Sequence, residues 1–345
     1  MRAMHLAAEI HLPEAGTLLG TLLPYADFNP VREWLHLQSV RRGLASLGDE
    51  PAPITLTPRW DETLGPPYVS ALRAAAGDVA DDIPVDVVAP AVQHAVDALV
   101  TAGRIREGAR YTWRLQSFGA CDGQLLIDED ESPAAAFAVA ILEDEAEALP
   151  VRSLADLLGR ATPAGNGTEA PASADVPVFL DSRVLAETEA IATAAGERES
   201  GGILLGTVAR DPTSGALVIE ISAQVAAHDA VAEADSLRFT PRTWAAVHQA
   251  IRAHGRGLRR LGWWHSHPPA IWACRNCPAE RRERCASNVA FFSAMDVEVH
   301  RTAFAGAEQV ALLMSFHDQP RPRHDLFGWR KGMVLSRSFH ILEEQ

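Results

Sequence analysis

The sequence predicts a mixed α/β fold divided between two domains. Its 345 residues are enough for two domains, and 47% of them are hydrophobic, so each domain can bury a core. Residues 161–175, ATPAGNGTEAPASAD, are small, polar and rich in Pro and Gly, and they show no periodic apolar pattern. This composition predicts a linker between an N-terminal domain of residues 1–160 and a C-terminal domain of residues 176–345.

The N-terminal region shows one helical and one strand-like pattern. Residues 87–103 are apolar at helical spacing and end at Gly103, whereas residues 110–118 alternate as a strand does. A helix followed by a hairpin-like segment leaves a winged-helix element open as an alternative. We therefore expect a separate mixed α+β domain of unknown function, with substrate or partner binding as its candidate role.

Charge and hydropathy exclude some classes of partner. The formal net charge of −14 repels phosphate backbones, so nucleic acid is not expected as a partner. No run of about 18 uncharged apolar residues is present, and the N-terminus lacks the continuous apolar stretch of a signal peptide. The sequence predicts a cytoplasmic protein without a membrane partner.

The C-terminal region alternates helix and strand signals. Residues 182–196 have helical spacing, residues 201–209 and 216–226 form a hairpin around the turn DPTSG, and a helix begins after Thr240 with Pro241 at its first position. Residues 258–268 resume a strand, and residues 308–316 and 332–339 suggest further strands. The strand of residues 258–268 ends in the histidine pair HSH.

The histidine pair is a candidate metal site. His265 and His267 are separated by one residue, so an extended backbone points both side chains to the same side. A hydrolytic zinc site needs a third protein ligand and an open position, and Asp296 is the candidate third ligand. A general base must also take a proton from water, and Glu199, at the start of another strand, is a candidate for that role.

These residues resemble the signature of a known family. Glu199, the HSHP of residues 265–268 and the SAMD of residues 293–296 are similar, in order, to the Glu, HxHP and SxxD elements of the JAMM metalloproteases, also called the MPN+ family. The resemblance covers about residues 176–345. It implies an MPN domain, in which a curved mixed β-sheet is flanked by helices.

The resemblance also implies a role for each matched residue. His265, His267 and Asp296 would ligate a catalytic zinc ion, with water or substrate in the fourth position. Glu199 would act as general base and acid. Ser293 would donate a hydrogen bond to the oxyanion that develops during the reaction.

The family is known for cleaving isopeptide or peptide bonds after the C-terminal glycine of ubiquitin or ubiquitin-like proteins. Bacterial members act on ubiquitin-like modifiers, some in conjugation systems linked to phage defence, so E1-like and E2-like enzymes are expected partners. In the family, the stretch matching residues 227–238 lies near the groove for the modifier tail. Two alternatives stay open: processing of a sulfur-carrier protein, and a non-catalytic MPN scaffold, which would not need Glu199.

A cysteine-containing insertion departs from the family pattern. Between Pro268 and Ser293 lie 24 residues, more than family members commonly have. Cys274, Cys277 and Cys285 supply three soft ligands suited to a second, structural zinc ion. A disulfide or free thiols, and an iron–sulfur or redox role, remain alternatives. The fourth ligand is open, with His300, His317, His324 or a residue of the other domain as candidates.

Overall fold

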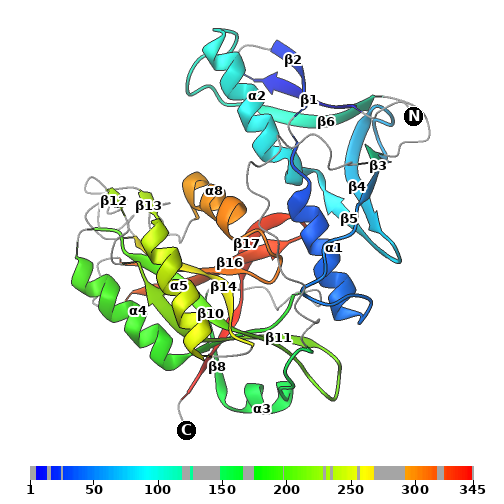
Figure 1. Cartoon of the computed structure of the whole chain (residues 1–345). Coiled ribbons are helices and arrows are strands. Elements are labelled where there is room, and N and C mark those ends of the chain that lie inside the picture. The colour runs from blue at the N-terminus through cyan, green and yellow to red at the C-terminus, as the bar shows by residue number, and fades with distance from the viewer. Residues whose placement is uncertain are drawn as a thin grey trace. The chain divides into compact units, whose positions relative to one another are not determined.

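The computed structural model describes residues 5–13, 17–24, 26–118, 125–126, 148–165, 175–196, 198–227, 231–233, 236–254, 257–267, 292–316 and 322–343. The chain divides into two compact units: residues 1–146 with 331–333, and residues 147–330 with 334–345 (Figure 1). Among the described residues, no helix has the length and apolar character needed to cross a membrane.

The N-terminal unit is built on a seven-stranded sheet. Its elements are β1 (His5–Leu12), β2 (Thr17–Leu22), α1 (Asn29–Arg41), β3 (Thr55–Trp60), β4 (Tyr68–Ala76), β5 (Val79–Pro84), the 3₁₀ helix η1 (Val85–Val88), α2 (Ala89–Thr101), β6 (Thr112–Phe118) and β7 (Leu125–Leu126). The strand order is β2-β1-β6-β4-β3-β7, with β5 on β4. The predicted helix and strand are confirmed as α2 and β6. Strand β6 pairs with β1 and with β4, both distant from it in the sequence, and so the described residues place it inside a larger sheet.

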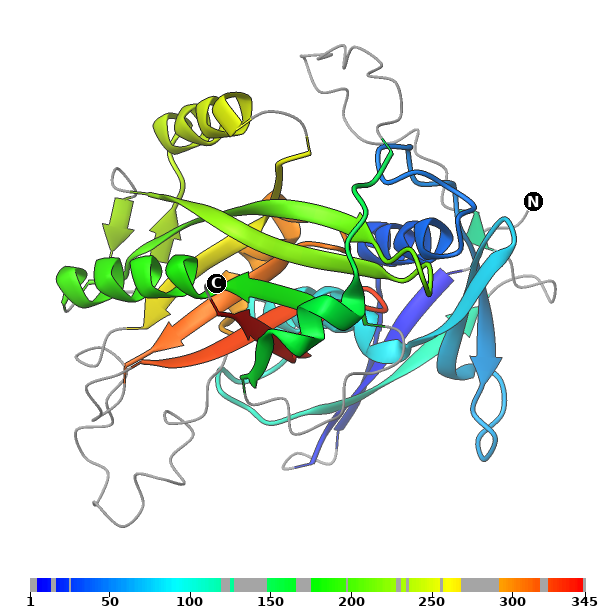
Figure 2. The same cartoon turned by 90° about the horizontal axis from the view of Figure 1, so that it is seen from below.

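The C-terminal unit is built on a nine-stranded mixed sheet (Figure 2). Its elements are α3 (Leu154–Gly159), β8 (Ala161–Ala164), β9 (Val178–Asp181), α4 (Ser182–Ala195), β10 (Gly201–Arg210), β11 (Leu217–Ala226), β12 (Val231–Glu233), β13 (Ser236–Arg238), α5 (Pro241–His254), β14 (Arg259–His267), α8 (Ala294–Ala303), β15 (Val310–Ser315), β16 (Arg323–Arg330), β17 (Met333–Arg337) and β18 (Phe339–Leu342). The strand order is β17-β16-β15-β14-β10-β11-β9-β18-β8. Neighbours β14 and β15 run parallel, whereas β10 pairs antiparallel with β11 and β14.

The predicted order of elements in this unit is largely confirmed. The helices α4 and α5, the hairpin of β10 and β11, and the strands β14 and β15 lie where the patterns place them. Residues 332–339 differ from the prediction, since they contribute to two strands, β17 and β18. The stretch 227–238 contains the two short strands β12 and β13, which pair with each other.

The predicted linker is partly a strand. Ala161–Ala164 forms β8, which pairs antiparallel with β18 at the edge of the nine-stranded sheet. An edge strand can contain a proline, here Pro163, because one side of its backbone needs no ladder partner. Its composition is therefore typical of a linker, although its backbone is hydrogen-bonded to β18. The division between the units falls after residue 146, earlier than the predicted boundary at residue 160.

The two faces of the C-terminal sheet are covered by different helices. Trp263 packs with Val247 of α5 and with the hydrophobic residues around α8 in one buried cluster. Trp264 points to the opposite face, because neighbouring side chains of a strand alternate. There its Nε1 donates to Gln224 at 3.3 Å, and the Gln224 amide donates to Glu187 of α4 at 3.4 Å. After a bulge in this strand, Trp263, His265 and His267 therefore lie on the side of β14 that faces α5 and α8.

A β-bulge decides which residues of β14 reach that face. Leu204 pairs with Gly262 but Leu205 pairs with Arg260, so Leu261 is the extra residue. Gly262 has a φ of 151° and lies so close to β15 that a Cβ there would be 1.8 Å from the Val310 carbonyl oxygen. Because one extra residue exchanges the two faces of a strand, the bulge directs both histidines toward α8.

Candidate metal centre

The two predicted histidine ligands lie together at the end of β14. His265 is 1% exposed and His267 is 4% exposed, so neither ring is in contact with bulk water. Their Nε2 atoms are 3.1 Å apart. The two Nε2 atoms thus converge on one point in space, as the alternation of the strand predicts.

Asp296 reaches the same point from the first turn of α8. Its Oδ1 lies 3.2 Å from the His265 Nε2, and its Oδ2 lies 3.7 Å from the His267 Nε2. Its position is fixed by a capping box: the Asp296 amide donates to the Ser293 Oγ at 3.1 Å, and the Ser293 amide donates to the Asp296 Oδ2 at 2.7 Å. The spacing SxxD therefore both starts the helix and orients the carboxylate.

The three side chains fit a tetrahedral zinc ion. Their ligand atoms all lie within 4.8 Å of one another. A zinc ion about 2.0–2.1 Å from each ligand atom would place those atoms about 3.3 Å apart, which is the edge of a tetrahedron. The His265 and His267 Nε2 atoms, 3.1 Å apart, and the Asp296 Oδ1, 3.2 Å from the His265 Nε2, are close to that edge. The 3.7 Å contact to the His267 Nε2 is made by the other carboxylate oxygen, Oδ2. Two imidazoles and one carboxylate leave the fourth corner to water or substrate, as in a catalytic site.

Asp296 is held in the ionised form that a ligand needs. Burial by itself would raise the pKa of Asp296, but the neighbouring His265 and His267 and the hydrogen bond from Ser293 outweigh it. The pKa consequently lies well below its ordinary value. At neutral pH the site offers one full negative charge to a cation.

Glu199 is placed near the histidines because the strand that follows it, β10, pairs with β14. It is 6% exposed and precedes Ser200 and β10. The Ser200 amide donates to the Ser266 Oγ at 3.0 Å, and the Ser266 amide donates to the Ser200 carbonyl at 2.9 Å. Gly201 is opposite His265, so the same register carried two residues back brings Glu199 level with His267. The buried carboxylate is thereby placed at the histidine end of β14.

The Ser293 hydroxyl is engaged with Asp296 through both of its atoms. Its Oγ accepts the Asp296 amide as the N-cap of α8, and its O–H group hydrogen-bonds to the Asp296 carboxylate, which helps to lower the pKa of that carboxylate. Donation to a substrate would require this one hydrogen to turn away from Asp296. The structure brings Glu199, Ser293 and the three candidate ligands to one end of the C-terminal sheet.

Two buried aromatic groups stand behind the candidate ligands. The Trp263 ring stacks on His265, with ring centres 4.6 Å apart and planes inclined by 12°. The Trp263 Nε1 donates to the His300 Nδ1 at 3.1 Å. Nothing in the sequence pairs Trp263 with His300, which lies 37 positions further along the chain.

Acid is expected to destabilise the fold through His300. This residue is fully buried, and desolvation together with the charge of Arg337 lowers its pKa from 6.5 to about 3. Between those pH values the unfolded chain binds a proton that the folded chain does not, so stability falls as pH drops from about 6.5 and levels off below about 3. The loss attributable to His300 is about 5 kcal/mol at most, on the scale of about 1.4 kcal/mol per pKa unit. Urea titrations of metal-free protein from pH 8 to pH 4 measure it.

The matched variant for this prediction is His300→Asn. Asparagine can accept the Trp263 hydrogen bond near the former Nδ1 position but does not titrate. The stability difference between the two proteins should therefore change with pH, in favour of the variant as pH falls. Parallel pH profiles would contradict a depressed pKa at His300.

The predicted cysteine cluster lies outside the described residues, since Cys274, Cys277 and Cys285 all fall between residues 267 and 292. Two of its candidate fourth ligands have other partners. His300 accepts from Trp263, and the His324 Nε2 lies 3.0 Å from a Glu189 carboxylate oxygen of α4. His317 also lies outside the described residues.

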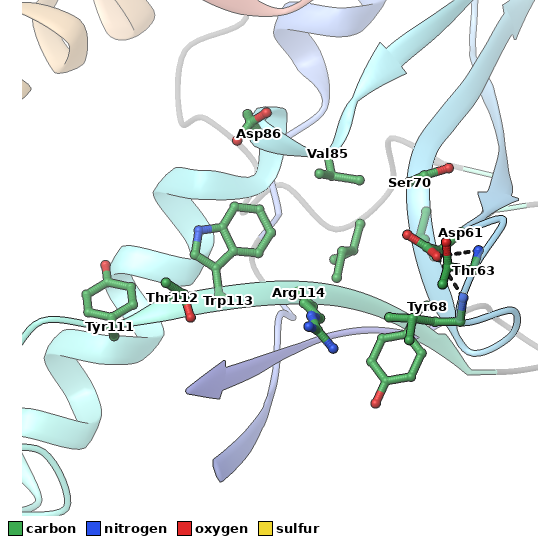
Figure 3. A pocket seen from close by; sticks show the side chains of 13 residues that line it. Asp61, Thr63, Tyr68, Ser70, Val85, Asp86, Tyr111, Thr112, Trp113 and Arg114 are labelled. Carbon is green, nitrogen blue, oxygen red and sulfur yellow. Dashed lines mark hydrogen bonds between the residues drawn. The ribbon is translucent and has the colours of Figure 1, made fainter. Parts of the chain in front are cut away.

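A pocket of about 730 Å³ lies in the N-terminal unit, away from the predicted site residues (Figure 3). Tyr68, Trp113 and Arg114 are among the side chains that line it. The Arg114 guanidinium lies 6.0 Å from the centre of the Tyr68 ring. Asp61 is turned back onto its own loop, where it accepts the amides of Thr63 and Leu64 at 2.8 Å each. This pocket has no counterpart in the sequence prediction.

Comparison with known proteins leaves the family open. No family model matches the chain, and no curated protein matches it. Among solved structures, the solution structure of protein DSY2949 from Desulfitobacterium hafniense matches with a TM-score of 0.33 and 22% identity, over 49% of this chain and 93% of that one. A similarity this low does not identify a fold family or a function, so the assignment rests on the residues of the site.

Proposed function

We propose that this chain is a zinc-dependent peptidase of the JAMM type, which cleaves an isopeptide or peptide bond after the C-terminal glycine of a ubiquitin-like protein. The observation that carries the proposal is the convergence of His265, His267 and Asp296, whose candidate ligand atoms all lie within 4.8 Å of one another. These ligands come from β14 and α8, and they are the residues that the resemblance to the JAMM family singles out.

In this proposal each residue has one chemical task. Zinc, when bound, supplies Lewis-acid polarisation of the scissile carbonyl and acidifies water at the open position. Glu199 would accept a proton from the attacking water and deliver it to the leaving nitrogen. The Ser293 hydroxyl donates to the oxygen on which negative charge develops. The low exposure of Glu199 and His267 fits general-base chemistry, because burial strengthens electrostatic interactions.

The substrate class is what the resemblance to the JAMM family implies, since its members cleave after the C-terminal glycine of a ubiquitin-like protein. The N-terminal unit is proposed to bind the modifier, its conjugate, or an E1-like or E2-like partner enzyme. Processing of a sulfur-carrier protein is the alternative substrate, with the same catalytic residues.

Glu199→Gln is expected to slow cleavage by about 100-fold or more, because glutamine cannot accept the proton. The substrates are a ubiquitin-like protein joined through its C-terminal glycine to a lysine side chain, and the same protein extended by a single amino acid. Cleavage of the first supports the isopeptidase, and cleavage of the second alone supports the sulfur-carrier processor. Zinc per chain is counted for each protein.

The control is Glu187→Gln, which makes the same chemical change at an exposed carboxylate of α4. It should leave both cleavage and zinc content unchanged. Equal cleavage by wild type and Glu199→Gln would refute the role of Glu199. A wild-type protein that binds zinc and cleaves neither substrate would favour the non-catalytic scaffold.

A further inference from the structure

His265 lacks the hydrogen bond that usually orients a metal-binding histidine. Its Nε2 faces Asp296 and His267, so a supporting carboxylate or carbonyl would be expected at its Nδ1. That Nδ1 is buried and has no hydrogen-bond partner among the residues that the structure describes. On the Nδ1 side of this ring, the contacts that the described residues supply are therefore packing contacts.

Trp263 supplies that packing. The indole lies nearly parallel to the His265 ring at 4.6 Å, and the Phe304 ring lies nearly parallel to the indole at 6.0 Å. Stacking fixes the tilt of a ring but allows it to slide. The hydrogen bond from the Trp263 Nε1 to the His300 Nδ1 restrains the indole within its own plane.

A buried histidine at position 300 lowers the stability of the fold, and an apolar side chain would fill the same space without that loss. Because the His300 Nδ1 accepts, the neutral ring carries its proton on Nε2, and that atom has no hydrogen-bond partner within the described part of the chain. Burial also depresses its basicity strongly. A leucine or phenylalanine packed beside Phe292, Phe304 and Trp329 would avoid both costs. What histidine adds is an acceptor for the indole.

His300 and Asp296 lie on the same helix, four residues apart, and so on the same face of α8. Asp296 contacts the histidine ligands directly, and His300 contacts the tryptophan behind one of them. We propose that the hydrogen bond between Trp263 and His300 positions His265 as a metal ligand by holding β14 and α8 in one register. Trp263 and His300 are positioning residues, and this role rests on the proposed metal site.

The test measures metal binding by the full chain, not cleavage. Zinc affinity is obtained by competition with a chromophoric chelator, and the Co²⁺-substituted protein is examined by its visible spectrum. A site of imidazole and carboxylate ligands lacks the thiolate charge-transfer band of a cysteine site, which separates it from the three cysteines. His300→Leu removes the acceptor, Trp263→Phe removes the donor, and His300→Asn keeps an acceptor.

We expect His300→Leu and Trp263→Phe to weaken zinc binding by about 10–100-fold and to change the Co²⁺ spectrum. His300→Asn should stay close to wild type. The control Val247→Ala opens a cavity in the same core cluster on α5, and it should lower stability without changing zinc affinity.

Wild-type zinc affinity and spectrum in His300→Leu would overturn the positioning role, as would an equal loss of affinity in Val247→Ala. If either His300→Leu or Trp263→Phe does not fold, the other decides. Failure of the wild type to bind zinc at the histidines would instead refute the metal site itself, and zinc binding without cleavage would refute only the peptidase.

Discussion

Asp296→Asn is expected to abolish both stoichiometric zinc binding at the histidines and peptide cleavage. An amide is neutral and a poor zinc ligand, so one of three protein ligands is lost. If each ligand contributes a third of a zinc-binding free energy of about 12 kcal/mol, the loss is about 4 kcal/mol, or about 1000-fold in affinity. Zinc per chain after dialysis and chelator competition measure the loss.

Asparagine is chosen because it preserves the hydrogen bonds that start the helix α8. Its side-chain oxygen can still accept the Ser293 amide, so the capping box and the start of α8 are retained, whereas Asp296→Ala would remove both functions at once. The matched control is Glu298→Gln, an exposed carboxylate two residues further along α8. Wild-type zinc binding by Asp296→Asn would show that the two histidines and the carboxylate form only a hydrogen-bonded cluster.

The candidate site could be predicted because its residues carry local patterns. Alternation along a strand is enough to place His265 and His267 on one side. The spacing from Ser293 to Asp296 is also a capping-box pattern, which would have predicted the helix α8, although the sequence suggests only a ligand there. Joining the two segments required the resemblance to a family, since no local rule brings residues about 30 positions apart to one point.

The hydrogen bond behind the site could not be predicted. Trp263 and His300 belong to different elements, and their contact depends on how α8 packs against β14. A lone buried histidine in a sequence looks the same whether it binds metal, accepts a hydrogen bond or fills a core. Reading His300 as a candidate ligand for the cysteines followed from composition alone.

Most strands of the N-terminal sheet could not be predicted either, because their pairing also depends on contacts between distant parts of the chain. Its first strand pairs His5 with Phe118, more than a hundred positions away. The strand β5, VADDIP, carries two aspartates and shows no simple alternation of apolar residues. Strand pairs that are distant in sequence are determined by tertiary packing, which outweighs local propensity. Only α2 and β6, with clear periodicity, were predicted.

Gly262→Ala is expected to destabilise the C-terminal unit by about 4 kcal/mol or more, at the extreme end of single substitutions. The new Cβ would lie 1.8 Å from the Val310 carbonyl oxygen and 2.8 Å from its carbon, and both are backbone atoms that cannot rotate away. Accommodating it requires β14 to separate from β15, or the bulge to shift. Either change displaces His265 and His267, so zinc binding should be lost together with stability.

Gly257→Ala separates this clash from backbone strain. Gly257 also has a positive φ, of 87°, but a Cβ there meets nothing within 4 Å. Its replacement should cost about 1–2 kcal/mol, the usual penalty of a left-handed conformation, and should leave zinc affinity unchanged. Urea unfolding and zinc competition on both variants provide the comparison. Similar losses in the two variants would mean that β14 does not approach β15 at Gly262, and the bulge would then not determine which face the histidines occupy.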